Sequence, residues 1–561
     1  MAPQASQPID PQDPQLTTGR FLAEVARRHG ERRAILFEGR EISYLELERE
    51  SRRLARALIG AGVVKGARVA VLMANRPEWI FSHFAAGLVG AVLAPVNTFA
   101  SRGELQYILR HSDASLLLMQ PALLKHDFLG DLLADHPAIA KGRPGELRCT
   151  ELPQLRRVVC LGIDAPRGGA ETWEQLLALE ESVSDELLDA CCAEVEPADD
   201  GVLIYTSGTT SRPKGVLHSQ RSGVLQGWRF VDFMCFTPDD RLYTTYPFFW
   251  TAGIAMSLHA TLAAGGCLLL QESFDAEAAL DLIEAERATA VHAWPHQGKA
   301  MAEHPTAARR DLSCITKLDS GASLAELAGI EKDEYGVGAS YGLSETFTIA
   351  SGIPADSPAE LRRSTHGKPW PGNVFRIVDP LSGERLAAGQ EGEIALKGAS
   401  FMRGYYKRLP EQAVDEDGFF RTQDGGCIDA DGYLHWSGRL SNIIKTGGAN
   451  VSPVEIEEAV SQHPCVKVGI PVGVEHETLG EAIVLCAVPV EGARIDEQEL
   501  RAWLRERLAA YKVPKRVLIF SPGELSYTGT QKIKVEPLKQ QALAKLAGSE
   551  IDGHRYGNQE D

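Results

Sequence analysis

The chain has 561 residues, more than one hydrophobic core usually supports, so two or more domains are expected. Its formal net charge of −18 at pH 7 argues against a general affinity for nucleic acid or anionic membranes, because long-range electrostatics would repel both. Any cationic binding site must therefore be local.

The two ends and the cysteines limit the possibilities further. Residues 1–16 are rich in Pro, Gln and Asp and lack the regions of a signal peptide, so a disordered lead-in is expected. A disordered tail is expected at 548–561. Ten scattered cysteines without paired CxxC spacing indicate reduced thiols and give no zinc signature. No apolar run is long enough to cross a bilayer, so a cytoplasmic protein is expected.

The first predicted elements alternate between helices and strands. Ser43, followed three residues later by Glu46, predicts a capped helix that begins near Tyr44. The next predicted elements are a strand at 69–73, a helix at 77–89 and a strand at 91–96. This alternation predicts an α/β fold with mainly parallel sheets.

Toward the C-terminus the pattern changes twice. From Arg376, short strand-like pieces separated by Pro and Gly predict a small β subdomain at about 370–439. A helix from 454, strands at 466–472 and 483–488, and a helix at 496–509 are predicted next. We therefore expect a large N-terminal domain at 17–439 and a small α+β C-terminal domain at 440–547.

The segment Y-T-S-G-T-T-S-R-P-K-G, residues 205–215, is the strongest local signal, and it follows an apolar run. Small residues let backbone N–H groups converge on an oligophosphate, the hydroxyls add donors, and Lys214 neutralises charge. The spacing is not that of the common P-loop, so ordinary kinases and GTPases are disfavoured. A plain polar turn is the alternative.

A second cluster, S-Y-G-L-S-E-T at 340–346, supplies an aromatic ring, hydroxyls and a carboxylate. Tyr341 could stack on a purine, and Glu345 could hold Mg²⁺, which prefers oxygen ligands. The bland alternative is an exposed Glu after a turn. A sharper rival is the nucleophile elbow G-x-S-x-G around Ser340, which requires a helix after the serine and leaves the phosphate segment without a role.

A third cluster comprises R-T-Q-D-G at 421–425, D-G-Y-L-H-W-S-G-R at 431–439 and K-T-G-G-A-N-V at 445–451. Y-K-V-P at 511–514 and T-Q-K-I-K at 530–534 follow. Together with the two earlier motifs, and in this order, these segments resemble the acyl-CoA synthetase branch of the adenylate-forming (AMP-binding) superfamily. The resemblance covers nearly the whole chain.

The resemblance implies a large domain of packed α/β sheets, a β subdomain and a small mobile C-terminal domain, with the active site in their cleft. It implies two half-reactions: a carboxylate attacks the α-phosphorus of ATP and releases pyrophosphate, and the thiol of coenzyme A then displaces AMP from the acyl carbon. Such enzymes act in fatty acid and related metabolism. The enzyme's task is to position groups and stabilise phosphate charge.

The resemblance also assigns roles near the phosphates. Thr206 to Lys214 would hold the β- and γ-phosphates, and Tyr341 would lie against adenine. Ser344 and Glu345 would manage the α-phosphate and Mg²⁺, with Thr206 as a second metal contact. The nucleotide-binding positions in this part of the chain would be Thr206, Ser207, Gly208, Thr209, Thr210, Lys214, Gly321, Ala322, Ser323, Tyr341 and Gly342.

Further roles fall in the C-terminal third. Asp424 would accept both ribose hydroxyls, Arg439 would touch ribose or phosphate, and Lys445 would be a second cation near the nucleotide. Lys532 would bridge the carboxylate and the α-phosphate as the catalytic lysine. Gly447 and Gly448 would flank the pantetheine of coenzyme A, and Ser441 would be the hinge.

Two positions depart from the family pattern. Gln423 and Gln531 stand where the family usually has glycine. A side chain there would alter the loop if a positive φ were required. These departures leave room for a slow or inactive enzyme. The small polar Ser441 can still absorb a hinge rotation.

The acyl pocket is expected to be apolar. The segment P-F-F-W-T-A-G-I at 247–254 resembles the pocket wall, with Trp250 as an aromatic gate. No cation is evident for a second carboxylate, which favours an apolar monocarboxylic acid. Fatty, aromatic and alicyclic acids all remain open. The expected pocket residues are Trp250, Gly253, Ile254, Trp294, His296 and Phe347, with Ser320, Gly321 and Ala322 as further candidate walls.

Three functional classes are considered. The leading one is an acyl-CoA ligase that uses ATP, Mg²⁺ and coenzyme A. An adenylating enzyme that loads a carrier protein, or uses the adenylate otherwise, is the nearest rival, and a nucleotide-binding pseudo-enzyme is the third. The partners expected are small molecules and no nucleic acid, and homodimer formation is left open.

Overall fold

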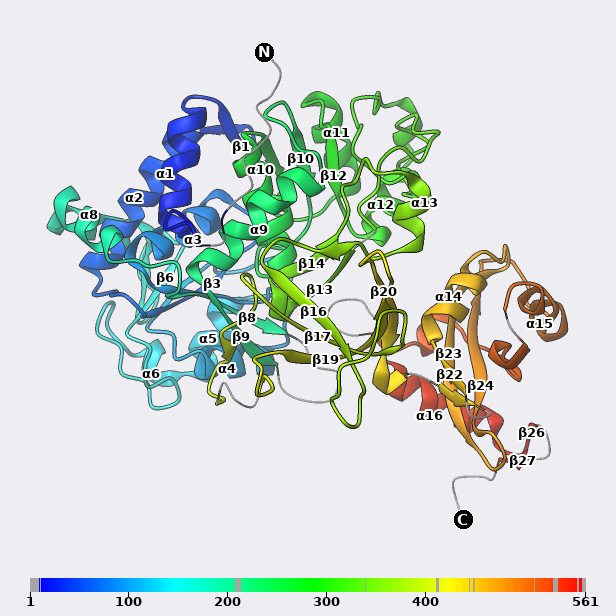
Figure 1. Ribbon diagram of the computed structural model, residues 1–561. Helices are drawn as coiled ribbons and strands as arrows, with labels where there is room; N and C mark the ends of the chain where they lie inside the picture. The colour runs from blue at the N-terminus through cyan, green and yellow to red at the C-terminus, as the bar shows by residue number, and fades with distance from the viewer. Residues whose placement is uncertain are drawn as a thin grey trace. The chain divides into compact units, whose positions relative to one another are not determined.

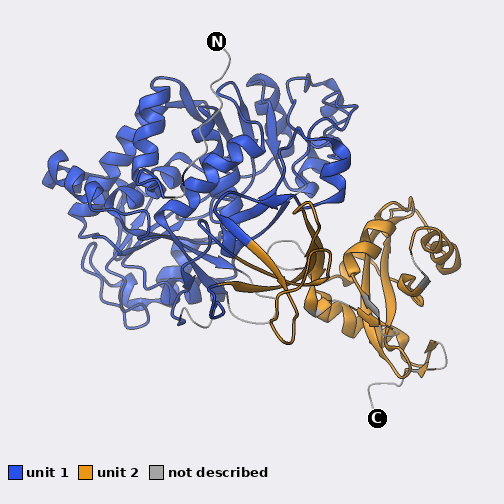
Figure 2. Cartoon of the chain, in the orientation of Figure 1, with its two compact units in different colours: residues 1–208, 212–374, 397–418 blue, residues 209–211, 375–396, 419–561 orange. Residues whose placement is uncertain are grey.

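The computed structural model describes residues 10, 12–206, 213–338, 340–409, 413–442, 444–446, 449–508, 510–527, 533–551 and 554–556. The chain divides into two compact units, coloured separately in Figure 2. Unit 1 comprises residues 1–208, 212–374 and 397–418, and unit 2 comprises 209–211, 375–396 and 419–561.

The largest sheet of unit 1 has eight strands in the order β18-β9-β8-β4-β3-β5-β6-β7. The pairs from β8 through β7 are parallel, whereas β9 and β18 are added antiparallel at one edge. Its strands are β3 Arg68–Leu72, β4 Val92–Pro95, β5 Leu116–Met119, β6 Arg157–Cys160, β7 Ala170–Thr172, β8 Asp200–Thr206, β9 Lys214–Ser219 and β18 Gly404–Tyr405.

A second sheet of unit 1 has the order β12-β10-β11-β1-β2. One hydrophobic cluster contains residues of both sheets and of the helices α1, α2, α3 and α9, which Figure 1 labels. The strands of this sheet are β1 Arg33–Phe37, β2 Arg40–Ser43, β10 Arg241–Thr244, β11 Cys267–Leu270 and β12 Ala290–His292.

The helices of unit 1 connect and cover these sheets. They are α1 Thr18–His29, α2 Tyr44–Gly60, α3 Pro77–Val89, α4 Arg102–His111, α5 Phe128–Asp135, α6 Pro137–Ala140, α7 Trp173–Leu177, α8 Asp185–Ala193, α9 Gln220–Phe233, α10 Ala260–Ala264, α11 Ala276–Ala285, α12 Pro295–Ala302 and α13 Ala359–Ser364. A π-helix, η2 Gly253–His259, precedes α10.

The predicted N-terminal elements are confirmed. Helix α2 begins at Tyr44 because the side chain of Ser43 accepts a hydrogen bond from the backbone N–H of Glu46. Helix α3 spans the predicted residues 77–89, and every residue in it except Glu78 is buried. A helix that is apolar on all sides belongs in a protein interior, which is where the two sheets place it.

Two smaller sheets follow. The first joins β13 Ser340–Leu343, β14 Thr348–Gly352 and β15 Lys368–Pro369. The second, the β-rich region predicted after Arg376, has the order β16-β17-β19-β20. Its strands are β16 Asn373–Val378, β17 Gly392–Gly398, β19 Phe420–Ile428 and β20 Leu434–Arg439.

The C-terminal part of unit 2 is a mixed sheet, β22-β21-β24-β23, with β25 parallel to β24. Its strands and helices are β21 Ile444–Thr446, β22 Ala449–Val451, α14 Pro453–Ser461, β23 Val466–His476, β24 Gly480–Pro489, α15 Glu497–Arg505, β25 Arg516–Ile519 and α16 Val535–Leu546. These match the predicted order of helix, two strands and helix.

The described part of the tail differs from the disordered tail expected from the sequence. Strands β26 Glu550–Ile551 and β27 His554–Arg555 pair with each other. Ile551 and Tyr556 are buried in the cluster around β23, β24 and α16. His476 also approaches the Ile551 carbonyl at 2.9 Å through Nε2. Apolar burial by two residues orders a segment whose composition is polar.

No helix in the described ranges is long and apolar enough to cross a membrane. All ten cysteines are free, as their spacing predicted.

The core of unit 1 contains three histidines that should make the protein sensitive to acid. Burial lowers the pKa of His218, His259 and His292 to about 4. Below pH 6.5 these histidines bind protons in the unfolded chain but stay neutral in the folded chain. The free energy of unfolding therefore falls as the pH drops from 6.5 toward 4.

We expect His292→Gln to show this effect in urea unfolding at a series of pH values. The stability of the wild type relative to the variant should fall by up to about 3 kcal/mol between pH 6.5 and pH 4, because the variant cannot titrate there. His296→Gln is the control, since His296 is exposed. A constant difference between wild type and His292→Gln would contradict the prediction.

Candidate active site

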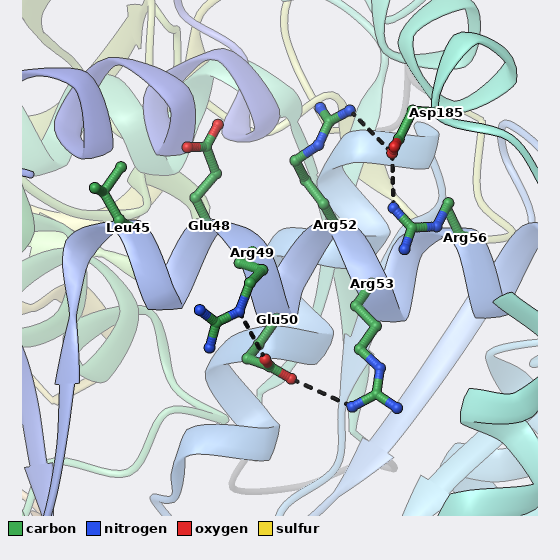
Figure 3. Close-up of a pocket in the computed structure, with 8 residues that line it drawn as sticks. All are labelled: Leu45, Glu48, Arg49, Glu50, Arg52, Arg53, Arg56 and Asp185. Carbon is green, nitrogen blue, oxygen red and sulfur yellow. Dashed lines mark hydrogen bonds and ion pairs between the residues drawn. The ribbon is translucent and has the colours of Figure 1, made fainter.

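A surface groove on α2 contains none of the predicted site residues (Figure 3). Its arginines already face acidic partners: Arg56 lies 2.7 Å from Asp185, and Arg53 lies 2.6 Å from Glu180. The groove is therefore an ion-paired surface that joins α2 to neighbouring segments. Its lining residues are Leu45, Glu48, Arg49, Glu50, Arg52, Arg53, Arg56 and Asp185.

The phosphate segment joins two neighbouring antiparallel strands. Thr206 ends β8 and Lys214 begins β9, and the two are direct Cα partners. The hairpin therefore holds the ends of the predicted phosphate cradle side by side. Residues 207–212, which include the predicted Ser207, Gly208, Thr209 and Thr210, lie outside the described residues.

Tyr405 joins this hairpin to the second motif. Its hydroxyl donates a hydrogen bond of 2.6 Å to Oε1 of Glu345, and Nζ of Lys214 lies 5.2 Å from the centre of its ring. The backbone N–H of Met402 also donates to the carbonyl of Glu345 at 2.7 Å. The two contacts of Tyr405, with Glu345 and with Lys214, depend on the pairing of β18 with β9. We did not predict Tyr405, although the aromatic pair G-Y-Y at 404–406 is a visible signal.

The backbone after Glu345 is strained. Phe347 has φ 54° and Thr348 has φ 87°, which non-glycine residues rarely adopt. Gln226 on α9 holds this turn, because its side-chain amide donates to the Phe347 carbonyl at 3.1 Å and to the Ile349 carbonyl at 2.6 Å. Strain of this kind is typical of functional sites and persists only where surrounding contacts enforce it.

His218 supports the same turn from β9. Its Nε2 lies 2.7 Å from the carbonyl oxygen of Ser344, so the neutral ring donates there. Burial lowers the pKa of His218 to about 4, which keeps the imidazole uncharged near neutral pH. Ser344 and Glu345 are thus fixed through their backbone by residues that we did not predict.

Gly342 is required for a close approach. A Cβ atom at this position would lie 1.9 Å from the carbonyl oxygen of Thr348 in the facing strand. Tyr341 beside it is buried, with 6% of its surface exposed. Ser340 lies in strand β13, which leads into a short 3₁₀ turn rather than the helix of a nucleophile elbow.

The predicted residues Gly321, Ala322 and Ser323 lie in a run of turns between β12 and β13. The backbone N–H of Ala322 donates to the carbonyl of Asp319 at 2.9 Å. Gly321 and Ser323 are exposed and Ala322 is partly buried, as is the preceding Ser320.

The predicted acyl-pocket residues divide into two groups. Trp250 and Trp294 pack edge to face, with ring centres 5.7 Å apart, and Tyr246 lies 4.8 Å from Trp294. Phe99, an exposed aromatic residue, lies 6.3 Å from Trp250. Phe249 completes this aromatic cluster at 5.1 Å from Trp250.

The other group is more deeply placed. Phe347 and Ile254 have no exposed surface and belong to the main core. Gly253 begins the π-helix, where a Cβ atom would lie 2.1 Å from the Pro247 carbonyl oxygen. A π-turn is frequent at functional sites. His296 is exposed at the start of α12.

In unit 2, Asp424 and Arg439 are direct partners on β19 and β20. Nε of Arg439 lies 3.0 Å from Oδ1 of Asp424, whose surface is 2% exposed. A terminal nitrogen of Arg439 donates to the Thr422 carbonyl at 2.7 Å, and the Thr422 hydroxyl accepts from the Asp424 N–H at 3.1 Å. These contacts hold the Asp424 carboxylate and the backbone around it in place.

Gln423 has φ 61°, so the departure from glycine falls on a left-handed residue. Glu393 holds this conformation. Its Oε1 accepts the Gln423 N–H at 2.8 Å, and its Oε2 accepts from Nε of Arg421 at 2.7 Å. Glu393 is only 4% exposed, so this carboxylate stabilises the turn that carries Asp424, a role not predicted from the sequence.

The remaining predicted residues are only partly described. Lys445 lies in β21 with an exposed side chain, and its backbone N–H donates to Oε2 of Glu481 at 2.8 Å. Ser441 lies in the short 3₁₀ turn η6, Leu440–Asn442. Gly447, Gly448, Gln531 and Lys532 lie outside the described residues.

Two family models match the chain. The model of the AMP-binding enzymes matches residues 22–406, and that of the AMP-binding enzyme C-terminal domain matches residues 455–532. The chain therefore belongs to the AMP-binding enzyme family, in its acyl-CoA synthetase branch, as the motifs indicated. It is an AMP-forming acid–thiol ligase, and such enzymes use ATP, Mg²⁺ and coenzyme A.

Individual relatives extend over the same length. The chain is 35% identical over 525 residues to a feruloyl-CoA synthase of Amycolatopsis, covering 92% of this chain and 97% of the relative. It is 32% identical over 518 residues to the indoleacetate–CoA ligase of Aromatoleum aromaticum, covering 91% and 95%.

Solved structures share the expected fold. The ATP-bound MatB of Rhodopseudomonas palustris superposes with a TM-score of 0.72 and 26% identity, covering 94% of this chain and 99% of that one. An anthranilate CoA ligase with anthranoyl-AMP superposes with a TM-score of 0.78 at 24% identity, covering 96% and 99%. The predicted α/β fold with a small C-terminal domain is confirmed.

The strain at Gln423 can be tested by restoring glycine. We expect Gln423→Gly to raise the free energy of unfolding by about 1 kcal/mol, because glycine adopts φ > 0 without a Cβ conflict. Gln423→Ala is the matched control, since it removes the exposed side chain but keeps Cβ. Chemical denaturation measures both variants, and equal stability of Ala and Gly variants would refute the strain.

The contact between Tyr405 and Glu345 should matter for adenylation. Tyr405→Phe keeps the ring beside Lys214 but removes the hydroxyl that donates to the carboxylate. We expect kcat/KM for adenylate formation to fall about 10-fold or more, the usual effect of losing a hydrogen bond to a charged group.

Tyr406→Phe is the control for this measurement, because the Tyr406 hydroxyl donates instead to Asp113 at 2.9 Å. An equal loss in both variants would show that the hydroxyl of Tyr405 has no special role.

Proposed function

We propose that this ligase activates an apolar aromatic monocarboxylic acid as its acyl-adenylate and transfers the acyl group to coenzyme A. The observation that carries the activation step is the assembly of Lys214, Tyr405 and Glu345 at one sheet edge. A cation and an anchored carboxylate at the phosphate hairpin are what in-line displacement at the α-phosphorus of ATP requires.

The order of the chemistry follows from leaving groups. A carboxylate resists attack by a thiol, whereas an acyl-adenylate carries AMP, which departs readily. In the first step the substrate oxygen forms a bond to the α-phosphorus, and the bond to pyrophosphate breaks. In the second, the sulfur of coenzyme A bonds to the acyl carbon, its proton is lost, and AMP leaves.

We assign the phosphate side as follows. Lys214 neutralises the β- and γ-phosphates, and Ser344 orients the α-phosphate. Glu345 and Thr206 would hold Mg²⁺, since their oxygen atoms suit a hard cation and Tyr405 orients the carboxylate. Bound there, Mg²⁺ would neutralise phosphate charge.

We assign the nucleoside and catalytic roles in the same way. Tyr341 lies against adenine, and Asp424, held by Arg439, accepts the ribose hydroxyls. Lys532 is the catalytic lysine. Ser441 is the hinge about which the C-terminal domain rotates between the two half-reactions. Gly447 and Gly448 lie beside the path by which the thiol of coenzyme A reaches the acyl carbon.

The preference for an aromatic acid rests on the cluster of Phe99, Tyr246, Phe249, Trp250 and Trp294. The rings of this cluster can make offset-stacked and edge-to-face contacts with a planar aromatic acid. A flexible alkyl chain cannot make these contacts. The feruloyl-CoA synthase and indoleacetate–CoA ligase relatives support the same class by name.

We also propose that the enzyme works in the cytoplasm, since its ten unpaired thiols suit a reducing compartment. The oligomeric state is left open, with a homodimer as one candidate to be tested by light scattering. Transfer of the acyl group to a carrier protein is the alternative second step.

A panel of acids tests the proposal. ATP, Mg²⁺ and aromatic, fatty or alicyclic acids are supplied with and without coenzyme A, and pyrophosphate, AMP and thioester are measured. We expect pyrophosphate with each accepted acid, thioester only with coenzyme A, and the highest kcat/KM with aromatic acids. Formation of ADP, or an acyl-adenylate that coenzyme A does not convert to the thioester, would contradict the proposal.

Two variants sharpen the result. Trp294→Ala should lower kcat/KM for an aromatic acid about 2- to 10-fold more than for a fatty acid, because it removes ring contacts of about 0.5–1.5 kcal/mol beyond simple burial. Lys299→Ala, at an exposed position of helix α12, is the control. Loss of activity toward both acids alike would argue against an aromatic preference.

Lys532 separates the half-reactions. Lys532→Ala should slow adenylate formation by about 10²–10³, the usual effect of removing an electrostatic group, and largely spare thioester formation from a supplied acyl-adenylate. A bulky residue at Gly447 should do the reverse. Single-turnover kinetics resolves both, and equal slowing of both steps in both variants would reject the two-step assignment.

A further inference from the structure

Three potential metal ligands meet outside the candidate active site, in unit 1. His136 connects helices α5 and α6, and Cys149 and Glu151 lie in the irregular segment 141–156 that precedes β6. One donor atom from each of the three residues lies within 4.8 Å of the other two. We propose that His136, Cys149 and Glu151 bind a zinc ion that joins this segment to the α5–α6 corner.

The individual distances suit one ion. Sγ of Cys149 lies 3.8 Å from Nδ1 of His136 and 3.2 Å from Oε2 of Glu151. Ligands about 2.0–2.3 Å from a tetrahedral zinc lie about 3.3–3.8 Å from each other. Only small side-chain movements would therefore bring the three atoms onto one ion.

The donor set selects the metal. Sulfur, imidazole nitrogen and carboxylate oxygen together suit Zn²⁺, whereas Mg²⁺ takes oxygen ligands. A thiolate and a carboxylate balance the double charge of the ion. Glu151 is exposed while the other two are buried, so a water molecule can reach the fourth position from the solvent side.

The metal-free cluster leaves a buried group poorly satisfied. His136 is 5% exposed, and its Nε2 is buried without a hydrogen-bond partner in the part of the chain that the structure describes. Its Nδ1 has only the distant thiol. Buried polar atoms nearly always have partners. Coordination through Nδ1 would replace this distant thiol contact with a metal bond and would leave Nε2 as the protonated ring nitrogen, still without a partner among the described residues.

The backbone at His136 is already held by hydrogen bonds, and residues beside Cys149 are anchored in the core. The His136 carbonyl accepts from Ile139 at 2.8 Å, and the His136 N–H donates to Leu132 at 3.1 Å. Beside Cys149, the side chains of Leu147 and Leu152 are buried in the core. The His136 side of the site is thus formed before metal binds, and the ion would cross-link to it a segment that lacks regular secondary structure.

Zinc and cobalt binding by the full-length protein, measured in the absence of nucleotide, test this proposal. The protein is first stripped of metal with a chelator. When zinc is then added, we expect it to bind one Zn²⁺ per chain and its melting temperature to rise. Co²⁺ should give a sulfur-to-cobalt charge-transfer band and the visible absorption of a tetrahedral site. Absence of stoichiometric zinc, or a cobalt spectrum without the sulfur band, overturns the proposal.

Glu151→Gln is the decisive variant, because Glu151 is exposed and its replacement should not disturb folding. We expect it to weaken zinc binding about 100-fold or more, since changes even beyond the ligands cost 10–100-fold. Glu146→Gln is the matched control on the same segment, also exposed. Equal zinc affinity of Glu151→Gln and wild type refutes the three-ligand site.

Cys149→Ser should abolish the sulfur band, whereas Cys314→Ser, at another buried cysteine, should keep it. A sulfur band that persists in Cys149→Ser overturns the assignment. Adenylate formation by Glu151→Gln is measured separately, so a failure of the zinc site and a failure of the proposed ligase reaction are distinguishable.

Discussion

The pairing of β18 with β9 is the constraint on which the candidate site depends. It brings Tyr405 against the phosphate hairpin, where the hydroxyl holds Glu345 and the ring faces Lys214. Without this edge strand, an anion and a cation separated by 131 positions in the sequence would have no common support. A short antiparallel addition to a mainly parallel sheet thus couples the groups that we propose for phosphate and metal binding.

Strained backbone recurs at the proposed functional residues. Phe347 and Thr348 follow the Glu345 turn with positive φ, held by Gln226, and Gln423 precedes Asp424 with positive φ, held by Glu393. In each case a buried side chain satisfies the backbone of the strained turn. The carboxylates are therefore oriented before any nucleotide arrives, which reduces the reorganisation that the reaction requires.

Much of the architecture was predictable from local patterns. Residues 77–89 were recognised as a helix, and the strands around them as buried, because apolar periodicity and Pro at a helix start are properties of neighbouring residues. The polar tail composition concealed the β26–β27 hairpin, since its order depends on Ile551 and Tyr556 meeting a core formed elsewhere. Trp294 and Phe347 looked alike in sequence, yet one joins an aromatic cluster and the other the central core.

The sequence by itself determined the family, the reaction class and the residues of the separate motifs, because their types and spacing carry the chemistry. Only the tertiary structure decided that Tyr405 and Glu393 support those motifs, that Gln423 is strained, and that His136 lies beside Cys149. The physical reason is that these contacts join segments distant in sequence or depend on backbone torsions. Sheet pairing and core packing set both, and the order of residues does not show which distant segments will meet.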